Sequence, residues 1–477
     1  MDFFKNILQF YQNTPKKYKI LLGLLILVNV MIKTYWLINA PIFVDEAWTF
    51  FNFTAKGFMA STTEYPAPNN HILHSVLTNI SYYLPFSDTI NLRMPNFLIN
   101  LISVFAFFLA FAKLFNYKTG LIFAGIFSFS FPMLYYGYVA RGYTMILLFY
   151  LIVFYAGIQI MQKNRQKSIQ KYLVAISLAS ILGFYTMPSF LYPYATTLLF
   201  LLLIFVKEKD ILSIKKLIFS ALITGITVLL LYLPVFINSG IDAVIANRYV
   251  RRWGLLRIAK NLPHHFNESS IFLSYLPLFI SLPLLGILIW KLKKISWNNE
   301  VKFAVFTIVI TPFILLIHRV TPFPRTWIYL LIPVLFLLAT YVNHSVKIYK
   351  NTQLMFVFTT VFAVAQVIYG SVRIKQIDHM SYEIDKVAQY IKNKDAKHIY
   401  IGKDAYLGTN LKYIFRDNQT IHFTENEAQI DIDKIKQYDF LILREDDAKD
   451  IGHLKNFDKR FTINETGWIH DIFERTK

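Results

Sequence analysis

The chain has 477 residues, of which 55% are hydrophobic, 17% are aromatic and only 16% are charged. A soluble protein carries about a quarter charged residues, so this composition excludes an ordinary soluble enzyme. The net charge of +20 does not indicate nucleic-acid binding, because residues 371–477 hold 18 Lys+Arg and 19 Asp+Glu, whereas residues 1–370 hold 31 and 10. The chain has no cysteine, which excludes disulfides and thiolate chemistry.

Long apolar runs separated by short basic stretches predict a polytopic α-helical membrane protein with about 11 transmembrane helices. The first run is too long for a cleaved signal peptide and reads as a signal anchor. The expected spans are 20–40, 93–112, 119–136, 143–162, 172–186, 189–206, 217–236, 271–290, 301–318, 326–345 and 353–370.

The distribution of basic residues predicts the orientation of these spans. Twenty of the 31 basic residues before position 371 fall at the N-terminus or in alternate loops, which become cytoplasmic if the N-terminus is inside. An odd number of spans then leaves the C-terminal part outside. We expect a multi-pass protein of a plasma (inner) membrane, with 1–370 as the transmembrane catalytic domain and 371–477 as a small extracytoplasmic α/β domain.

Asp45 and Glu46 follow the first span directly and open a long outer loop, about 41–91. Two carboxylates at the mouth of a span are costly unless they serve a function there. They are therefore the first candidates for catalytic groups.

The same loop contains the stretch EYPAPNNHILH, which includes Glu64, Asn70, His71 and His74. The prolines and asparagines predict a rigid polar turn at a helix entry. Glu64 is a further catalytic candidate, and Asn70, His71 and His74 are candidates for positioning the substrate. A divalent metal held by Asp45, Glu64 and His71 is one hypothesis; helix-entry residues hydrogen-bonded to the backbone are the alternative.

Arginines dominate the basic residues on the expected outer side, where they suit a phosphate ligand because guanidinium binds phosphate in a bidentate way. Arg93 opens the second span, where it either contacts phosphate or extends to lipid headgroups. Arg141 lies between Tyr138 and Tyr143 in a short loop, and a charge at that depth generally faces a cavity with a partner. The two tyrosines are typical of an interfacial belt or of a surface that stacks on sugars.

Two later segments add further candidates for phosphate binding. Arg251 and Arg252 belong to RYVRRWGLLRIAKNLPHHF, which has the pattern of an amphipathic element at anionic headgroups, so contact with membrane lipid and grip on the substrate stay open. Arg325 lies in HRVTPFPRTWIYLLIP, where proline stiffens the backbone. A rigidly held charge is what a phosphate clamp requires.

These motifs together resemble the GT-C glycosyltransferases, nearest to the branch of protein O-mannosyltransferases and aminoarabinose transferases. The resemblance covers most of 20–345 and is carried by Asp45-Glu46, PAPNNHILH, Arg93-Met-Pro, ARGY and PRTWIYLLIP. It implies a polyprenyl-phosphate-linked sugar donor, Asp45 at the catalytic centre, Glu64 at the acidic position before the proline pair and Arg325 near the lipid phosphate. The chain departs from the pattern at PAPNN, where relatives often have Lys-Pro-Pro.

The resulting hypothesis is inverting sugar transfer from a polyprenyl-phosphate donor to an extracytoplasmic lipid, glycan or protein acceptor, with Asp45 as base and no required cofactor. The family branch favours a bacterial membrane. A transporter or flippase of a lipid-linked or anionic solute is the first alternative, although we find no internal repeat of the transporter kind. A structural or assembly protein is the second, and it leaves Asp45 and Glu46 without a role.

Overall fold

The computed structural model describes residues 9–162, 169–247, 250, 252–345, 352–402, 406–425, 437–444, 456–465 and 468–476. The chain divides into two units: residues 1–38 with 53–370, here called the membrane unit, and residues 39–52 with 371–477, here called the α/β unit. Each unit is described by itself.

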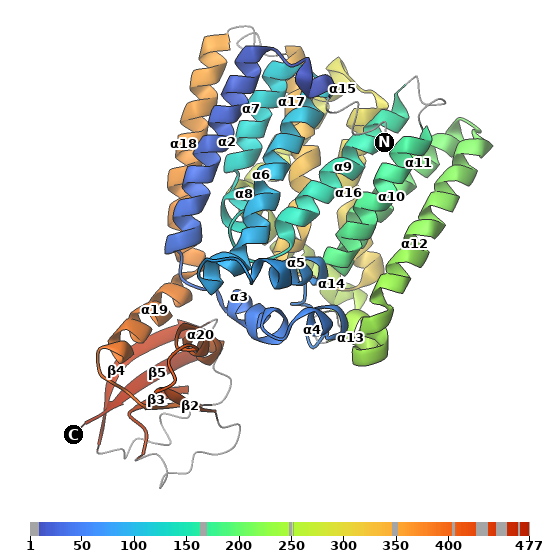
Figure 1. Ribbon diagram of the computed structural model, residues 1–477. Helices are drawn as coiled ribbons and strands as arrows, with labels where there is room; N and C mark the ends of the chain where they lie inside the picture. The colour runs from blue at the N-terminus through green and yellow to red at the C-terminus, as the bar shows by residue number, and fades with distance from the viewer. Residues whose placement is uncertain are drawn as a thin grey trace. The chain divides into compact units, whose positions relative to one another are not determined.

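The membrane unit is a bundle of helices (Figure 1). Its elements are α2 (Lys16–Asn39), α4 (Phe58–Thr63), α5 (Ile72–Ser81), α6 (Asp88–Leu114), α7 (Tyr117–Phe129), α8 (Phe131–Tyr136), α9 (Tyr143–Met161), α10 (Ile169–Thr186), η3 (Pro188–Phe190), α11 (Leu191–Lys207), α12 (Ile211–Ser239), α13 (Asp242–Ile245), α14 (Leu255–Ser274), α15 (Leu278–Ile295), α16 (Asn299–His318), η4 (Pro324–Leu330), α17 (Leu331–Ser345) and α18 (Thr352–Ile377). A π-helix, η1 (Phe50–Thr54), and the last turns of α18 continue across the boundary between the units.

Within the described residues, nine helices are long and apolar enough to cross a membrane. A tenth span results if α14 and α15, which meet at a bend of 72°, count as one. The predicted polytopic helical class is thus confirmed, and the difference from about 11 spans has a local cause. The expected span 119–136 is broken at Ser130, whose backbone is extended, and continues as the short helix α8. Pro132 in the first turn of α8 has no N–H with which to extend the helical ladder.

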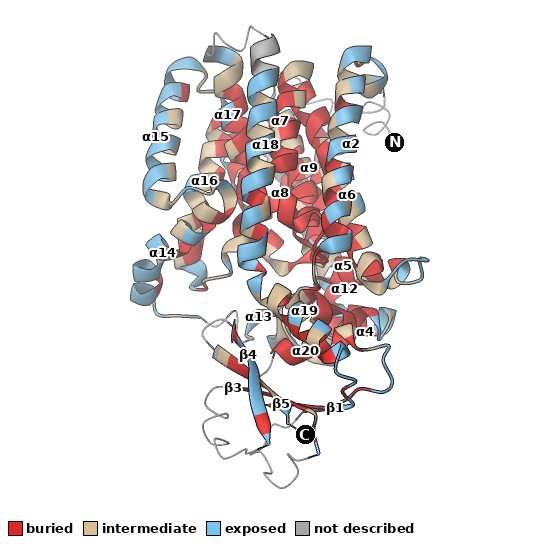
Figure 2. Cartoon of the chain, turned by 90° about the vertical axis from the view of Figure 1, so that its left-hand side faces the viewer, coloured by how far each residue is buried: buried red, intermediate tan, exposed pale blue. Residues whose placement is uncertain are grey.

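Burial separates the helices that face lipid from those that fill the bundle (Figure 2). Most of α9 is buried, whereas α12 and α18 expose most of their apolar side chains. In the interior, the rings of Phe107, Phe111 and Phe127 stack with centroid distances of 4.0 and 4.4 Å. Apolar side chains on the outside of such a bundle are in contact with lipid, so they need no further partner.

The α/β unit contains a five-stranded sheet with the order β2-β1-β3-β5-β4. Its elements are α3 (Val44–Thr49), α19 (His379–Lys392), β1 (His398–Ile401), α20 (Tyr406–Ile414), β2 (His422–Glu425), β3 (Phe440–Arg444), β4 (Phe457–Glu465) and β5 (Trp468–Arg475). β1 pairs in parallel with β2 and β3, whereas β5 runs antiparallel to β3 and β4. The predicted small C-terminal α/β fold is thus present.

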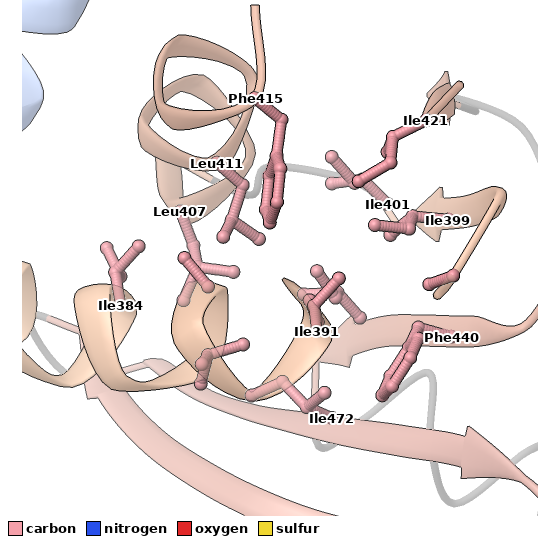
Figure 3. Close-up of a cluster of buried hydrophobic side chains, with 14 of the residues drawn as sticks. Ile384, Ile391, Ile399, Ile401, Leu407, Leu411, Phe415, Ile421, Phe440 and Ile472 are labelled. Carbon is pink, nitrogen blue, oxygen red and sulfur yellow. The ribbon is translucent and has the colours of Figure 1, made fainter. Parts of the chain in front are cut away.

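One apolar core joins α19 and α20 to the sheet (Figure 3). Ile384 and Ile391 of α19 and Leu407 and Leu411 of α20 are fully buried, and they pack against strand residues such as Ile472. The charged face of α19 is left to solvent, as its strong amphipathic pattern predicts. This core gives the unit its own hydrophobic centre.

The segment 39–52, which the sequence analysis assigned to the transmembrane domain, clusters with the α/β unit. It contains α3, and α3 packs on α20. Asp45 and Glu46 therefore lie on an element that belongs structurally to the C-terminal part of the chain.

Candidate functional site

The short helices α4, α5 and α13 and the helix α14 lie at one end of the helix bundle of the membrane unit (Figure 1). Four of the expected site residues are brought into contact there: His71, Arg141, Tyr143 and Arg325, here called the arginine–histidine cluster. They come from the start of α5, the loop before α9, the first turn of α9 and η4. Three separate segments, which carry His71, Arg141 with Tyr143, and Arg325, thus meet in this cluster.

His71 is in contact with two hydrogen-bond donors. The backbone N–H of Gly142 donates to Nδ1 at 2.6 Å, and Arg141 Nη2, which can only donate, lies 3.3 Å from Nε2. Burial, first, and then the charges of Arg141, His74 and Arg325 hold the pKa of His71 well below its usual value. The ring is therefore neutral.

Arg141 lies beside the imidazole ring. Its Nη2 is 3.3 Å from His71 Nε2, and its Nη1 donates to the Asn69 carbonyl at 3.1 Å. A buried guanidinium thus lies next to a neutral imidazole. Guanidinium groups bind the oxygen atoms of anions through charge-assisted hydrogen bonds.

Arg325 is held at the other side of the cluster. Its Nε donates to the Tyr143 hydroxyl at 2.7 Å, and its guanidinium lies over the ring of Phe323. Helix η4 itself is fixed by Trp327, which is fully buried and donates from Nε1 to Nε2 of His265 at 2.6 Å. A buried tryptophan with a satisfied N–H is a firm anchor, so Arg325 projects from a rigid turn, as the prolines predict.

The loop that carries Arg141 is shaped by a buried amide on α6. Asn96 Nδ2 contacts the carbonyls of Tyr136, Val139 and Arg141. The segment between α8 and α9 is not helical, so its carbonyl groups lack helical partners, and inside a membrane bundle each requires a donor. Lys33 of α2, fully buried, donates to the carbonyl of Met133 in the same region. Sequence analysis did not select Asn96, although its position after Arg93-Met-Pro at the start of a span is a usable signal.

Replacing Asn96 by Ala is expected to destabilise the protein, because three carbonyls each lose a donor, although Tyr136 still accepts from Thr144 Oγ1 and Val139 from the backbone N–H of Arg141. The net cost of a lost hydrogen bond is about 0.5–1.5 kcal/mol, and about 1–3 kcal/mol where a buried group is left unsatisfied. The measurement is the thermal unfolding midpoint of the detergent-solubilised protein. Asn238→Ala is the control, because Asn238 is exposed and its amide makes a single bond of 3.3 Å to Thr63. Equal midpoints for the two variants would show that Asn96 does not support the loop.

Arg93 and Tyr138 lie next to each other. The guanidinium of Arg93 is 5.6 Å from the centre of the Tyr138 ring, and its Nη1 donates to the Leu37 carbonyl at 3.2 Å. The Tyr138 ring is fully buried and stacks on Trp36. Arg93 is thus packed within the bundle and does not extend to the headgroup layer.

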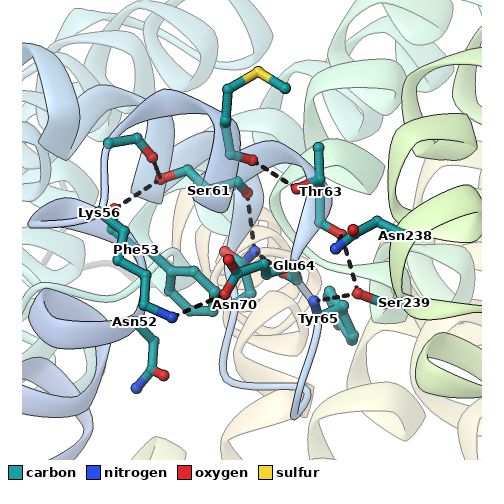
Figure 4. Close-up of polar contacts among 12 residues, drawn as sticks. Asn52, Phe53, Lys56, Ser61, Thr63, Glu64, Tyr65, Asn70, Asn238 and Ser239 are labelled. Carbon is teal, nitrogen blue, oxygen red and sulfur yellow. Dashed lines mark hydrogen bonds and ion pairs between the residues drawn. The ribbon is translucent and has the colours of Figure 1, made fainter.

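Glu64 and Asn70 shape the turn between α4 and α5 (Figure 4). Asn70 donates to the carbonyls of Ser61 and Glu64, both at 2.9 Å. The Glu64 carboxylate forms an ion pair of 3.1 Å with Lys56, and both side chains are well exposed. These contacts support a structural role for Asn70, in line with the helix-entry alternative.

A cavity of about 390 Å³ adjoins this turn and is lined by Glu64, Tyr65, Pro66, Ser239 and Ala243. Ser239 of α12 accepts from the backbone N–H of Tyr65 at 2.9 Å. Burial raises the pKa of Tyr65. The charge of Arg141 opposes this rise, and the neighbouring Tyr143 adds to it. Tyr65 therefore lies between the cavity and the arginine–histidine cluster.

His74 is fully buried one turn along α5, and its Nε2 has no hydrogen-bond partner among the residues that the structure describes. Burial, first, and the charge of Arg141 lower its pKa to about 3. Since the unfolded chain binds this proton near pH 6.5, the folded state is stabilised by the neutral ring above that pH and loses this stabilisation as the pH falls toward 3.

His74→Leu is therefore expected to make the protein less sensitive to acid. Each pH unit below 6.5 costs the wild type about 1.4 kcal/mol through this side chain, so about 2 kcal/mol separates the two proteins at pH 5 relative to pH 6.5. Unfolding midpoints at pH 7.5 and pH 5 measure the difference. His264→Leu, at an exposed position of α14, is the matched control, and identical acid sensitivity in all three proteins would refute the assignment.

Asp45 and Glu46 occupy the first turn of α3 in the α/β unit. Glu46 is fully buried and its Oε2 accepts from the backbone N–H of Phe43 at 2.9 Å. This reach back to the helix start is a capping contact, so Glu46 fixes the geometry of α3. The Asp45 carbonyl accepts from Thr49 Oγ1 at 2.7 Å, and the Asp45 side chain is half-buried.

Two candidates remain, Arg251 and Arg252. Arg251 falls outside the described residues. Arg252 is exposed just before α14. Arg257, in the first turn of α14, lies over the Trp253 ring, with its guanidinium carbon 3.5 Å from the ring centre. Among the residues that the structure describes, no three His, Cys, Asp or Glu side chains are grouped to hold a metal ion.

The fold has solved counterparts. ArnT from Cupriavidus metallidurans in the apo state superposes with a TM-score of 0.61 at 12% identity, covering 94% of this chain and 97% of that chain. The same enzyme bound to undecaprenyl phosphate gives a TM-score of 0.61 at 10% identity, with the same coverage. Comparisons with protein-family models and with curated proteins gave no match. The chain therefore has the fold of ArnT over nearly its whole length, which confirms the predicted architecture of a multi-span helical part and a small C-terminal α/β part.

Proposed function

We propose that this protein is a membrane glycosyltransferase that moves a sugar from a polyprenyl-phosphate donor to an extracytoplasmic acceptor. The observation that carries the proposal is the arginine–histidine cluster, which offers two guanidinium groups beside a neutral imidazole to an anion. The fold supports the same reading, since the ArnT structure that it resembles was solved with undecaprenyl phosphate.

In this proposal the cluster binds the donor phosphate. Arg141, positioned by His71, donates to a phosphate oxygen, while Arg325 neutralises the charge that grows as the phosphate departs. Donors already aligned toward developing charge commonly contribute more to catalysis than any other single effect. Arg93, packed on Tyr138, contributes to the positive field of this end of the bundle without touching the ligand.

Asp45 is assigned as the general base. Its carboxylate takes the proton of the acceptor hydroxyl as that oxygen forms a bond to the anomeric carbon, and the bond from that carbon to the phosphate oxygen breaks. Attack from the face opposite the phosphate inverts the anomeric configuration. The lipid phosphate leaves with the bonding electrons, and its added charge is held by guanidinium groups, so no step of this mechanism calls on a metal.

The acceptor has a candidate place in the membrane unit. The 390 Å³ cavity beside Glu64 has the volume of a small-molecule site. It combines a carboxylate with the apolar surfaces of Pro66 and Ala243, a combination that suits a hydroxylated group. The acceptor can be a lipid, a glycan or a protein that presents such a group. The distribution of basic residues supports the outer face of the membrane, and the resemblance to the family branch favours a bacterial plasma membrane.

The test uses the purified protein in liposomes with a radiolabelled polyprenyl-phosphate sugar and a crude extract of envelope acceptors. We expect release of unglycosylated polyprenyl phosphate together with label on an acceptor. Movement of intact donor between the leaflets without cleavage would identify a flippase instead. Because the chain lacks cysteine, a single cysteine at position 45 reports its side of the membrane directly, and labelling from the cytoplasmic side would contradict the proposal.

A further inference from the structure

The C-terminal unit of the chain contacts the short helix that bears the proposed base. Asn410 of α20 is fully buried and its Nδ2 donates to the Ile42 carbonyl, two residues before the start of α3, at 3.0 Å. Asn410 lies 368 positions away from Ile42, so this bond joins the two ends of the sequence within a single structural unit.

Aromatic contacts fix the other end of α3. Phe50, which follows the last residue of α3, meets the ring of Tyr413 edge-on at 5.0 Å, and Phe51 meets the same ring at 6.2 Å. Arg416 lies over both Phe50 and Tyr413, at 5.6 and 4.3 Å from the ring centres. One hydrogen bond before the helix and one aromatic cluster after it therefore hold α3 against α20.

The helix itself is too short to keep its own shape. An isolated helix of six residues is not stable in water, because nucleation costs more than its few hydrogen bonds return. Its internal contacts, the Glu46 cap and the Thr49 bond to the Asp45 carbonyl, define a local geometry only once the helix has formed. The ordering must come from packing, and within the α/β unit α20 supplies it.

We propose that Asn410 and Tyr413 are positioning residues, and that one task of the C-terminal α/β unit is to hold α3 and its Asp45 in reacting geometry. This inference rests on the proposed function. It also gives the α/β unit a role that the sequence left open. A misplacement of about 1 Å in a reacting group can lower a rate by about 10²-fold, so loss of these contacts is expected to lower kcat strongly.

The experiment compares four variants of the full-length protein. Asn410→Ala removes the donor to Ile42, and Tyr413→Ala removes the aromatic contact, whereas Tyr413→Phe keeps the ring as the matched control. Ile472→Val perturbs the core of the same unit, in the strand β5, and controls for a general loss of stability. Two quantities are measured for each: hydrogen exchange of the peptide 40–52, and turnover of the polyprenyl-phosphate sugar with its separate KM.

We expect Asn410→Ala and Tyr413→Ala to speed exchange in 40–52 about 10-fold or more and to lower kcat by about 10-fold to 10²-fold. The KM for the donor should be unchanged, because the arginine–histidine cluster is built from other segments. Tyr413→Phe and Ile472→Val should behave as wild type in both measurements.

Two outcomes would overturn the inference. Unchanged exchange in both alanine variants would show that α20 does not order α3. Faster exchange with an unchanged kcat would show that the order of α3 does not limit the reaction. A wild-type protein that fails to consume the donor would instead contradict the proposed function. In that case the hydrogen-exchange data alone would still decide whether α20 orders α3.

Discussion

Asp45→Asn is expected to lower the rate of sugar transfer by about 10²–10⁴-fold, the range typical for removal of a positioned general base. Asparagine has nearly the shape of aspartate but cannot take the proton of the acceptor hydroxyl. The contact of the Asp45 backbone carbonyl with Thr49 is untouched by the change, so α3 should keep its form. The measurement is the single-turnover rate with radiolabelled polyprenyl-phosphate sugar, together with the affinity for polyprenyl phosphate.

The affinity for the lipid is expected to stay near wild type, because the phosphate ligands belong to the arginine–histidine cluster. Asp88→Asn makes the same chemical change in the first turn of α6 and serves as control; its transfer rate should remain unaltered. Wild-type transfer by Asp45→Asn would remove Asp45 from the mechanism. A slow rate rescued at high acceptor concentration would reassign Asp45 from proton transfer to acceptor binding.

The membrane architecture was predictable because its signal is local. A run of about 20 apolar residues can be recognised without knowledge of any other part of the chain. The break at Ser130 was missed because the apolar run continues through it, and only Pro132 marks the place. The bend between α14 and α15 was not predicted for the same reason, because it lies within one apolar stretch. There Tyr275 adopts a left-handed conformation and Pro277 precedes the next helix.

The candidate site was predictable only in part, because a sequence shows the chemistry of each side chain but not its partners in the fold. His71, Arg141 and Arg325 were recognisable as polar groups in loops near spans. The supporting residues were not, since their importance depends on partners far away in sequence. Gly142 is an example: a Cβ at this position would lie 3.1 Å from His71 Nδ1 and closer still to Thr186, so glycine allows its N–H to approach the imidazole closely.

The assignment of α3 to the α/β unit could not be predicted from the sequence for the same reason. The segment 39–52 adjoins a span, so its position in the sequence favours the transmembrane domain. Its partner Asn410 lies in a helix that reads as an ordinary amphipathic element of a small domain. Pairing of two such segments is a long-range contact, and neither composition nor periodicity reports long-range contacts.

Arg325→Gln is expected to lower kcat/KM for the polyprenyl-phosphate sugar by about 10²–10³-fold, the usual cost of removing one donor aimed at developing negative charge. Glutamine keeps a polar side chain of similar reach but carries no charge. Arg325→Lys keeps the charge and loses the fork geometry and the Nε bond to Tyr143, so we expect an intermediate loss. Steady-state kinetics with varied donor measure these effects.

Tyr143→Phe separates the charge of Arg325 from its placement. The variant removes the hydroxyl that accepts from Arg325 Nε while keeping the ring contacts with His71 and Tyr136. It should lower kcat/KM less than Arg325→Gln, and the double variant should fall no further than Arg325→Gln alone, because both changes act through one guanidinium. Arg319→Gln, an exposed arginine of the same loop, is the charge-matched control and should leave the donor kinetics unaltered. If Arg319→Gln and Arg325→Gln lower kcat/KM equally, the effect is one of overall surface charge, and the proposed phosphate clamp at Arg325 is wrong.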